Sequence, residues 1–352
     1  MVTDQPGDAA LSDASNIDGD ALPDTPPEAH VPDAGGCDGS AAALAMDPMN
    51  CGRCGHDCLG GDCASGVCQP ITLAMEVEDA MALALDDGHV YWTTDGAGYV
   101  RRVAKDGGTV ATLASGQDFA WTIAVDTTTA YWVTNENDGG GGIHSAAEVG
   151  GALTALSTIG GVGVAVDTAS VYWADGAMSG HIWSVAHDGG GATALASNLP
   201  MPWRIALDAT SVYWTEPDAG RVRKVPLGGG DPTTLASGLQ EPTAIAVDGA
   251  DAYWTDAQSG SVSRVPIGGG APETLATLTT EVLSVEAVAV DSTAVYFTNY
   301  ARARFGGGLW MAPKSGGAAS RLVSCDQGLG TALDSRAVYW ACNGAIMKVG
   351  KP

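Results

Sequence analysis

A Tyr-Trp pair that recurs seven times is the feature that most constrains the fold of this chain. It is written Tyr-Phe once, and its tyrosines are Tyr91, Tyr131, Tyr172, Tyr213, Tyr253, Tyr296 and Tyr339. An Asp stands five residues before each of them: Asp86, Asp126, Asp167, Asp208, Asp248, Asp291 and Asp334. A spacing of 40 to 43 residues, filled with short β-type segments, is typical of propeller blades. The sequence therefore predicts an all-β fold, a seven-bladed β-propeller over residues 69–352.

Each repeat is predicted to contain four short strands, separated by turns rich in Gly, Pro and Asp. In the fifth repeat we expect them at residues 243–247, 252–255, 261–265 and 273–276. A central Ala in every first strand suits the crowded axis of a ring. The repeated Asp is expected to accept backbone N–H bonds in the first turn. Tyr and Trp point to opposite faces of the second strand, so they should fill the two layers between neighbouring blades.

The last repeat ends before its fourth strand, because the chain stops at Pro352. A matching segment, residues 70–74, stands just before the first inner strand. We expect this N-terminal strand to complete the seventh blade and so close the ring. Cys325 and Cys342 flank the inner strands of that blade, and they are expected to form a disulfide.

The net charge of −25 and the pI near 4.2 argue against nucleic acid as a partner, since phosphate binding needs clustered Lys and Arg. No apolar run is long enough for a transmembrane helix. A signal segment is also absent from this sequence, but eight cysteines favour an oxidising, extracytoplasmic location. We therefore expect an exported protein that is secreted, periplasmic or at the cell surface, with a lipid anchor as one option. Residues 1–36, acidic and without Lys or Arg, predict a disordered tether to a surface, with a leader of no function as the alternative.

Residues 37–68 form a cysteine-rich segment with few core-forming residues. Small segments of this kind are held together covalently, so we expect disulfides, whose pairing the sequence does not decide. Their cysteines are Cys37, Cys51, Cys54, Cys58, Cys63 and Cys68. A zinc site using Cys51, Cys54, Cys58 and His56 is the alternative.

Two family resemblances follow from these motifs. The Asn-Cys-Gly-x-Cys-Gly pattern at residues 50–55 resembles the Stig1-type cysteine-rich modules of secreted proteins, which implies an extracytoplasmic location. The Tyr-Trp-Thr-Asp-like tetrapeptide resembles the YWTD propellers of low-density lipoprotein receptors, and also Tyr-Trp repeat propellers of exported bacterial proteins. That receptor family has six blades, and here the fourth position is Asp only at Asp175 and Asp256. A propeller is thus implied, whereas a receptor role is not.

Irregular positions among the repeats indicate where a site could lie. Two repeats carry a Trp at the start of the inner strand, Trp121 and Trp203, where the others carry Met81, Val162, Thr243, Glu286 and Leu329. Together with Arg204 and Glu286, these Trp side chains could stack on and hydrogen-bond a sugar or another small ligand at the axial mouth. Alternatively, they fill the channel as core.

Acidic loops offer a second kind of site. Residues 135–138, Glu216 and Asp256 supply oxygen ligands that could hold calcium, although acidic loops are often only solvated. No His is expected on an inner strand, so we do not expect an axial metal site built on His. The function we predict is binding of a protein, carbohydrate or small molecule at the propeller face, without catalysis and without a required cofactor. A hydrolase or lyase using Glu286 or Asp residues at the mouth is the alternative.

Overall fold

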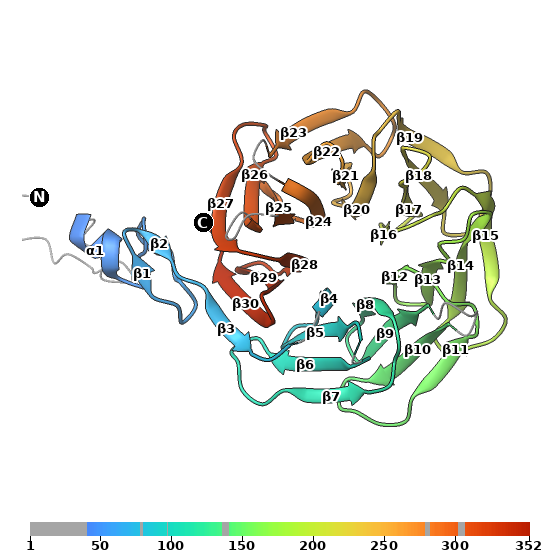
Figure 1. The fold of residues 1–352 in the computed structure, drawn as a ribbon, viewed down its shortest axis with the longest axis horizontal. Helices are drawn as coiled ribbons and strands as arrows, with labels where there is room; N and C mark the ends of the chain where they lie inside the picture. Colours follow the sequence, from blue (N-terminus) through green and yellow to red (C-terminus); the bar gives the residue numbers. More distant parts are fainter. Residues whose placement is uncertain (1–40, 78–79, 97, 136–140, 279–281, 302–306) are drawn as a thin grey trace, which may run out of the picture.

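Seven four-stranded antiparallel sheets stand around a central axis in the computed structural model of this chain (Figure 1). The structure describes residues 41–352 except 78–79, 97, 136–140, 279–281 and 302–306. The expected tether, residues 1–36, and Cys37 lie outside the described residues. The all-β, seven-bladed propeller predicted from the repeats is confirmed.

The first four blades follow the chain, each starting with its innermost strand. Blade 1 contains β4 (Ala80–Leu85), β5 (His89–Thr94), β6 (Val100–Ala104) and β7 (Ala111–Ala114). Blade 2 contains β8 (Ala120–Val125), β9 (Thr129–Thr134), β10 (Gly142–Ala147) and β11 (Thr154–Ser157). Blade 3 contains β12 (Gly163–Val166), β13 (Ser170–Ala174), β14 (Gly180–Ala186) and β15 (Thr193–Leu199). Blade 4 contains β16 (Ile205–Leu207), β17 (Ser211–Glu216), β18 (Arg221–Pro226) and β19 (Thr233–Ser237).

The remaining three blades complete the ring. Blade 5 contains β20 (Pro242–Val247), β21 (Asp251–Asp256), β22 (Ser261–Pro266) and β23 (Glu273–Thr277). Blade 6 contains β24 (Val282–Val290), β25 (Ala294–Ala301), β26 (Gly307–Pro313) and β27 (Ser320–Cys325). Blade 7 contains β28 (Gly328–Leu333), β29 (Ala337–Cys342), β30 (Ala345–Gly350) and, from the other end of the propeller segment, β3 (Ile71–Ala74). The predicted closure is confirmed, because β3 pairs antiparallel with β30.

Each layer between two blades is built from the same two side chains. The Tyr of one blade packs in one cluster with the Trp of the next, as Tyr213 does with Trp254 and Tyr91 with Trp132. The rule holds across the ring closure, where Tyr339 of blade 7 meets Trp92 of blade 1. The Trp side chains of the six Tyr-Trp pairs, and the Phe of the Tyr-Phe pair, are at most 1% exposed. The second strand therefore works as predicted, with one large ring on each of its faces.

The repeated Asp does more than the sequence predicted. It accepts the expected N–H bonds, which in blade 5 run from Ala250 and Asp251 to Asp248 Oδ1 at 3.0 and 2.9 Å. Its second carboxylate oxygen accepts the hydroxyl hydrogen of the repeated Tyr, over 2.5–3.1 Å in blades 1 to 5 and 7. Each Asp thus joins a turn to the buried ring that follows it.

We expect Tyr213→Phe to destabilise the protein by about 1.5–3 kcal/mol, the usual range for a hydrogen bond to a charged group. The change removes the hydroxyl that lies 2.5 Å from Asp208 and leaves the buried ring in place. Urea unfolding measures the effect. Tyr99→Phe is the matched control, since the described side-chain contact of Tyr99 is made by its ring, 3.9 Å from the Arg101 guanidinium. Equal midpoints for both variants and wild type would contradict the role of the Tyr–Asp bond.

The cysteine-rich segment lies outside the ring, beside blade 7 (Figure 1). It contains α1 (Ala41–Met46), β1 (Cys63–Ala64) and β2 (Val67–Cys68). Disulfides join Cys51 to Cys63 and Cys58 to Cys68, and Cys54 is disulfide-bonded as well. These bonds take up the thiolates that the zinc alternative required.

His56, the fourth ligand of that alternative, contacts backbone instead. Its Nδ1 lies 2.5 Å from the Cys51 carbonyl oxygen, and its Nε2 lies 2.7 Å from that of Lys351 in the last residues of the chain. An ion pair of 2.8 Å between Asp57 and Arg336 adds to the contact with blade 7. No helix among the described residues is long and apolar enough to cross a membrane.

Candidate functional site

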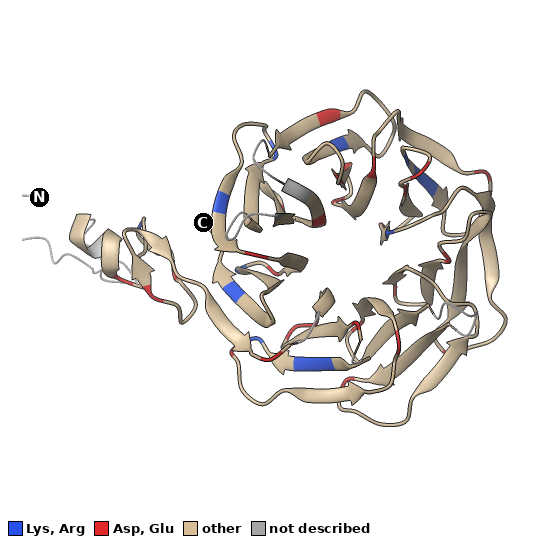
Figure 2. Ribbon diagram, in the orientation of Figure 1, with Lys and Arg blue, Asp and Glu red and all other residues tan. Residues whose placement is uncertain are grey.

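The channel along the axis narrows to a cavity of about 180 Å³ among the inner strands. Six of the seven residues that stand four positions before the repeated Asp line it, and the seventh, Gly163, lies against the Arg204 backbone. Arg204 is the one large residue among the seven; the others are Ala82, Thr122, Gly163, Ala244, Ala287 and Gly330. Since inner strands crowd at the axis, small residues are the expected packing solution. Arg204 breaks this rule, and Figure 2 shows the resulting basic stretch beside β16 at the inner edge of the ring.

Trp121 and Trp203 flank the Arg204 side chain. The guanidinium carbon lies 5.4 Å from the ring centroid of Trp203 and 5.9 Å from that of Trp121, within the range of cation–π attraction. The two indole rings meet edge to face, with centroids 5.9 Å apart and planes at 68°. The structure therefore brings together three of the residues predicted for this mouth, from blades 2 and 4.

The position of Arg204 is fixed by the neighbouring blade. Its guanidinium donates to the carbonyl oxygen of Val162 in blade 3. Gly163 permits this close approach, because a Cβ there would lie 2.5 Å from the Trp203 carbonyl oxygen. Burial lowers the pKa of Arg204 to about 10, and Glu286 opposes the shift. The side chain remains charged at neutral pH.

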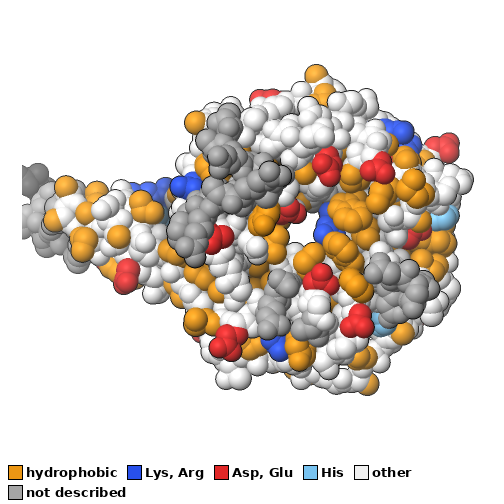
Figure 3. All heavy atoms as spheres, viewed as in Figure 1, with side chains coloured by type: hydrophobic (Ala, Val, Ile, Leu, Met, Phe, Trp, Pro, Cys, Tyr) orange, Lys and Arg blue, Asp and Glu red, His pale blue; other side chains and the backbone are white. Residues whose placement is uncertain are grey.

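Glu286 lines the same cavity and is the only carboxylate among its described lining residues. The Ser284 hydroxyl donates to one of its oxygens. The mouth thus presents a cation and an anion from blades 4 and 6, with small and aliphatic side chains around them. In the space-filling view, basic and hydrophobic side chains adjoin the central opening (Figure 3).

The segments that lead into the two Trp residues share an unusual backbone. Phe119 and Met201 each precede a Trp by two residues, and both are left-handed, with φ of 53° and 52°. A bulky residue held there costs of order 1–3 kcal/mol, and such strain concentrates at functional sites. Phe119 is also 37% exposed, so it adds apolar surface beside the mouth.

Glu216 and Asp256 do not belong to this mouth. Glu216 is fully buried, where it accepts the Trp214 indole N–H at 3.0 Å and pairs with Arg223 at 3.3 Å. Asp256 is 4% exposed and accepts N–H bonds from Gln240, Glu241 and Ser259. Both carboxylates are bonded to neighbouring strand or loop groups, so their positions give no support to the ligand-binding role expected of them.

The calcium expectation gains no support from these two residues for the same reason. Asn135 is described, but the rest of the loop expected to contribute, residues 136–138, lies outside the described residues. Elsewhere Asp86, His89 and Glu148 have potential ligand atoms within 4.8 Å of one another. The Arg102 guanidinium, 2.9 Å from His89 Nε2, brings a positive charge into that group and opposes a cation there.

The opposite mouth of the channel is a wide acidic bowl of about 1060 Å³. Its carboxylates are mainly those of the repeated Asp turns, already occupied by N–H groups and Tyr hydroxyls. One of them, Asp334, is also paired with Lys105 of the following blade, at 2.9 Å. The acidity of this bowl is therefore a consequence of how the turns are built.

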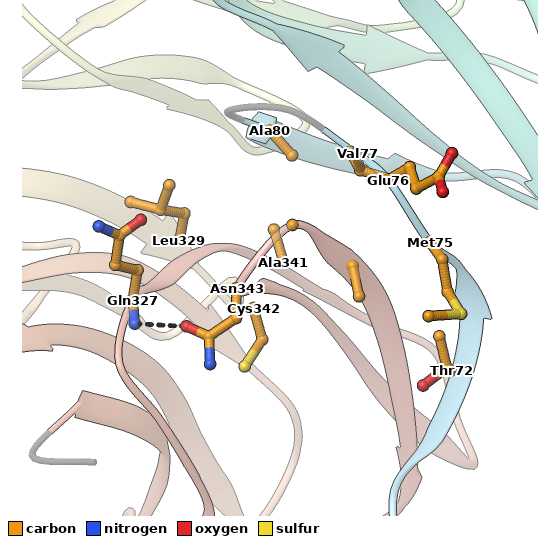
Figure 4. A pocket seen from close by; sticks show the side chains of 12 residues that line it. Thr72, Met75, Glu76, Val77, Ala80, Gln327, Leu329, Ala341, Cys342 and Asn343 are labelled. Carbon is orange, nitrogen blue, oxygen red and sulfur yellow. Dashed lines mark hydrogen bonds between the residues drawn. The ribbon is translucent and has the colours of Figure 1, made fainter. Parts of the chain in front are cut away.

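A second cavity, of about 470 Å³, lies at the seam where blade 7 is closed by β3 (Figure 4). Cys342 lines it together with Thr72, Met75 and Gln327. Cys325 and Cys342 are free thiols, so the expected fourth disulfide is not formed in the structure. The neighbouring Cys325 thiol lowers the pKa of Cys342.

No family model matches the chain, and no curated protein matches it in sequence. Solved structures do: the virginiamycin B lyase of Staphylococcus aureus superposes with a TM-score of 0.67 at 13% identity, covering 81% of this chain and 99% of the lyase. The WD40 propeller domain of Doa1 superposes with a TM-score of 0.65 at 13% sequence identity, covering 80% of this chain and 96% of that domain. A nidogen/laminin complex superposes less well, with a TM-score of 0.49 at 26% sequence identity, over 55% of this chain and 77% of that chain. The first two likenesses place the chain in the β-propeller class, whose members include both enzymes and other proteins.

Proposed function

We propose that this protein binds a small organic ligand at the channel mouth formed by Trp121, Trp203, Arg204 and Glu286. One observation carries the proposal: a desolvated guanidinium stands where the other six blades place a small residue. Packing alone would favour a small residue there as well. The backbone strain at Phe119 and Met201, two residues before each Trp, supports the same site.

The ligand class follows from Arg204 and Glu286, which line the cavity, and from the two Trp rings that lie beside Arg204. Arg204 suits a carboxylate, because its planar donors match two carboxylate oxygens. The indole rings offer faces to the C–H surface of a sugar-like ring, and Glu286 can accept hydroxyl hydrogens. A cavity of about 180 Å³ limits the enclosed part to a few heavy atoms. We therefore propose a small hydroxylated carboxylate, of which sugar acids are the simplest examples.

We also propose that the protein works outside the cytoplasm, as an exported and lipid-anchored protein with residues 1–36 as its tether. The disulfides of residues 51–68 support this location, since such bonds persist in oxidising compartments. Labelling of intact cells with a membrane-impermeant reagent tests it. Recovery of label only after lysis would contradict it.

We expect a sugar acid to raise the midpoint of thermal unfolding. At a ligand concentration of a hundred times Kd, the folded state is stabilised by about 2.7 kcal/mol. Arg204→Gln should weaken binding roughly a hundredfold, because a charge-assisted pair is lost. Arg321→Gln is the matched control, since Arg321 also lies over a Trp, with 5.5 Å from its guanidinium carbon to the Trp310 ring, but on an outer strand. Equal ligand shifts in both variants would refute the site, and no shift with any small molecule would favour a protein partner.

The enzymatic alternative rests on Glu286, a carboxylate beside a cation in a cavity. If it were a general acid or base, Glu286→Gln should reduce turnover of esters, lactones or glycosides by about 10²–10⁴-fold and remove one limb of the pH profile. For a binding protein we expect no turnover in wild type. A measurable wild-type rate that is lost in Glu286→Gln would replace the binding proposal.

A further inference from the structure

We propose that Cys325 and Cys342 form a reversible thiol–disulfide pair, in which Cys342 reacts with a small disulfide from solution and Cys325 resolves the adduct. This pair is independent of the channel mouth. It differs from the five described cysteines of the N-terminal segment, which are disulfide-bonded, because both of its members are thiols in the structure.

The fold places the two thiols at one seam. Cys325 ends β27, the outermost strand of blade 6, and Cys342 ends β29 of blade 7. The Asn343 side chain, next to Cys342, accepts the N–H groups of Asp326 and Gln327, next to Cys325, both at 3.1 Å. Figure 4 shows the bond from Gln327. These two bonds hold together the segments that follow the cysteines, and Cys325 and Cys342 pack in the same hydrophobic cluster.

Access is different for the two sulfurs. Cys325 is 1% exposed, whereas Cys342 is half-buried and lines the cavity of about 470 Å³ at the seam. A cavity of this size lies within the range of small-molecule sites. A small disulfide can therefore reach Cys342 but not Cys325, which fixes the order of the two steps.

Electrostatics favour the same order. The neighbouring Cys325 thiol lowers the pKa of Cys342, while the neighbouring Cys342 thiol and burial raise the pKa of Cys325. Cys342 is thus the better source of thiolate, and thiolate is the reacting form. Once the Cys342 sulfur is bound in an adduct, it no longer carries the negative charge that held the proton on Cys325.

The reaction balances with one small disulfide as oxidant. The Cys342 thiol gives up its proton, and its sulfur attacks one sulfur of the small disulfide, whose S–S bond breaks to release one small thiol. The Cys325 thiol then gives up its proton, and its sulfur attacks the Cys342 sulfur, breaking the mixed disulfide and releasing the second small thiol. Two protein thiols are oxidised to one disulfide, and one small disulfide is reduced to two thiols.

Variants of the full chain in which one of these two cysteines is replaced by Ser test this order, with glutathione disulfide as the probe. Cys325→Ser should accumulate a stable glutathione adduct, mapped by mass spectrometry to Cys342. In Cys342→Ser the buried Cys325 should react roughly tenfold more slowly or worse, because reactivity follows exposure and thiolate character. Reduced wild type should end as the Cys325–Cys342 disulfide without a lasting adduct.

Thermal melts of both Ser variants verify that each is folded before its rates are compared. Oxidation should raise the melting midpoint of wild type and leave that of either variant unchanged, because only wild type can link blade 6 to blade 7. Equal labelling rates in the two folded variants would overturn the proposal. A wild-type adduct that never resolves would overturn it as well.

Discussion

Lowering the pH from about 4 to about 2 is expected to unfold this propeller, because seven equivalent carboxylates take up protons together. Burial alone would raise the pKa of each repeated Asp, but the backbone, Tyr and Lys donors outweigh it. The pKa of Asp86, Asp248 and Asp334 is lowered to about 2, and that of the other four is lowered as well.

The direction of the pH effect follows from proton binding. A carboxyl with a lowered pKa binds protons more weakly in the folded protein than in the unfolded chain, where its pKa is near 3.9. The stability that it contributes is complete above that value and is lost as the pH falls toward 2. At higher pH the opposite trend is expected, since partial neutralisation of a charge of −25 relieves repulsion in the folded state. The midpoint of thermal unfolding should thus pass through a maximum in the mildly acidic range.

Calorimetry or circular dichroism at pH values from 7 to 2 measures this curve. Asp208→Asn provides the matched variant, because its amide oxygen can still accept the N–H bonds of Thr210 and Ser211 but the group no longer titrates. It should be less stable than wild type at neutral pH and should lose less stability between pH 4 and 2. A melting midpoint that does not change between pH 4 and 2 would show that the Asp turns do not couple to folding.

Truncation of the closing strand should have the second large effect. Leu73 of β3 is 6% exposed and packs with residues of blades 7 and 1. Leu73→Ala is expected to cost about 2–5 kcal/mol, the usual range for a buried Leu. Although Leu73 lies at the start of the propeller, ahead of the first blade, it is buried like a core residue.

Leu235→Ala in β19 is the matched control, since Leu235 occupies the same place in blade 4 and has the same exposed fraction of 6%. Denaturant unfolding should give similar losses for both variants. A loss below about 0.5 kcal/mol at Leu73, typical of a surface site, would mean that β3 does not close the ring in solution.

Much of this fold could be predicted because the repeats state it seven times. The period predicted the blades, the missing last strand predicted the closure by residues 70–74, and alternation along the second strand predicted the two aromatic layers. The Tyr–Asp hydrogen bonds were not predicted, although the constant separation of five residues was a usable signal. This separation places the Tyr hydroxyl of the second strand over the Asp turn that precedes the strand.

The candidate site was predicted less completely. Trp121, Trp203 and Arg204 come together as expected, and Glu286 lines the same cavity. Glu216 and Asp256 are predicted from the sequence to be ligand-binding carboxylates in loops, yet both are buried and already hydrogen-bonded. Sequence shows that a residue is acidic and near a loop, but not whether neighbouring N–H groups have already used its oxygens.

The sequence alone determined the number of blades, the order of their strands and the way the ring closes, because these depend on local periodicity that every repeat contains. The tertiary structure alone decided which side chains share a cavity, which carboxylates are occupied and which cysteine meets solvent. Those properties depend on residues brought together from different blades. Arg204 illustrates both: the sequence shows it as the one large residue at a position otherwise small, and only the ring places it between two Trp side chains at the axis.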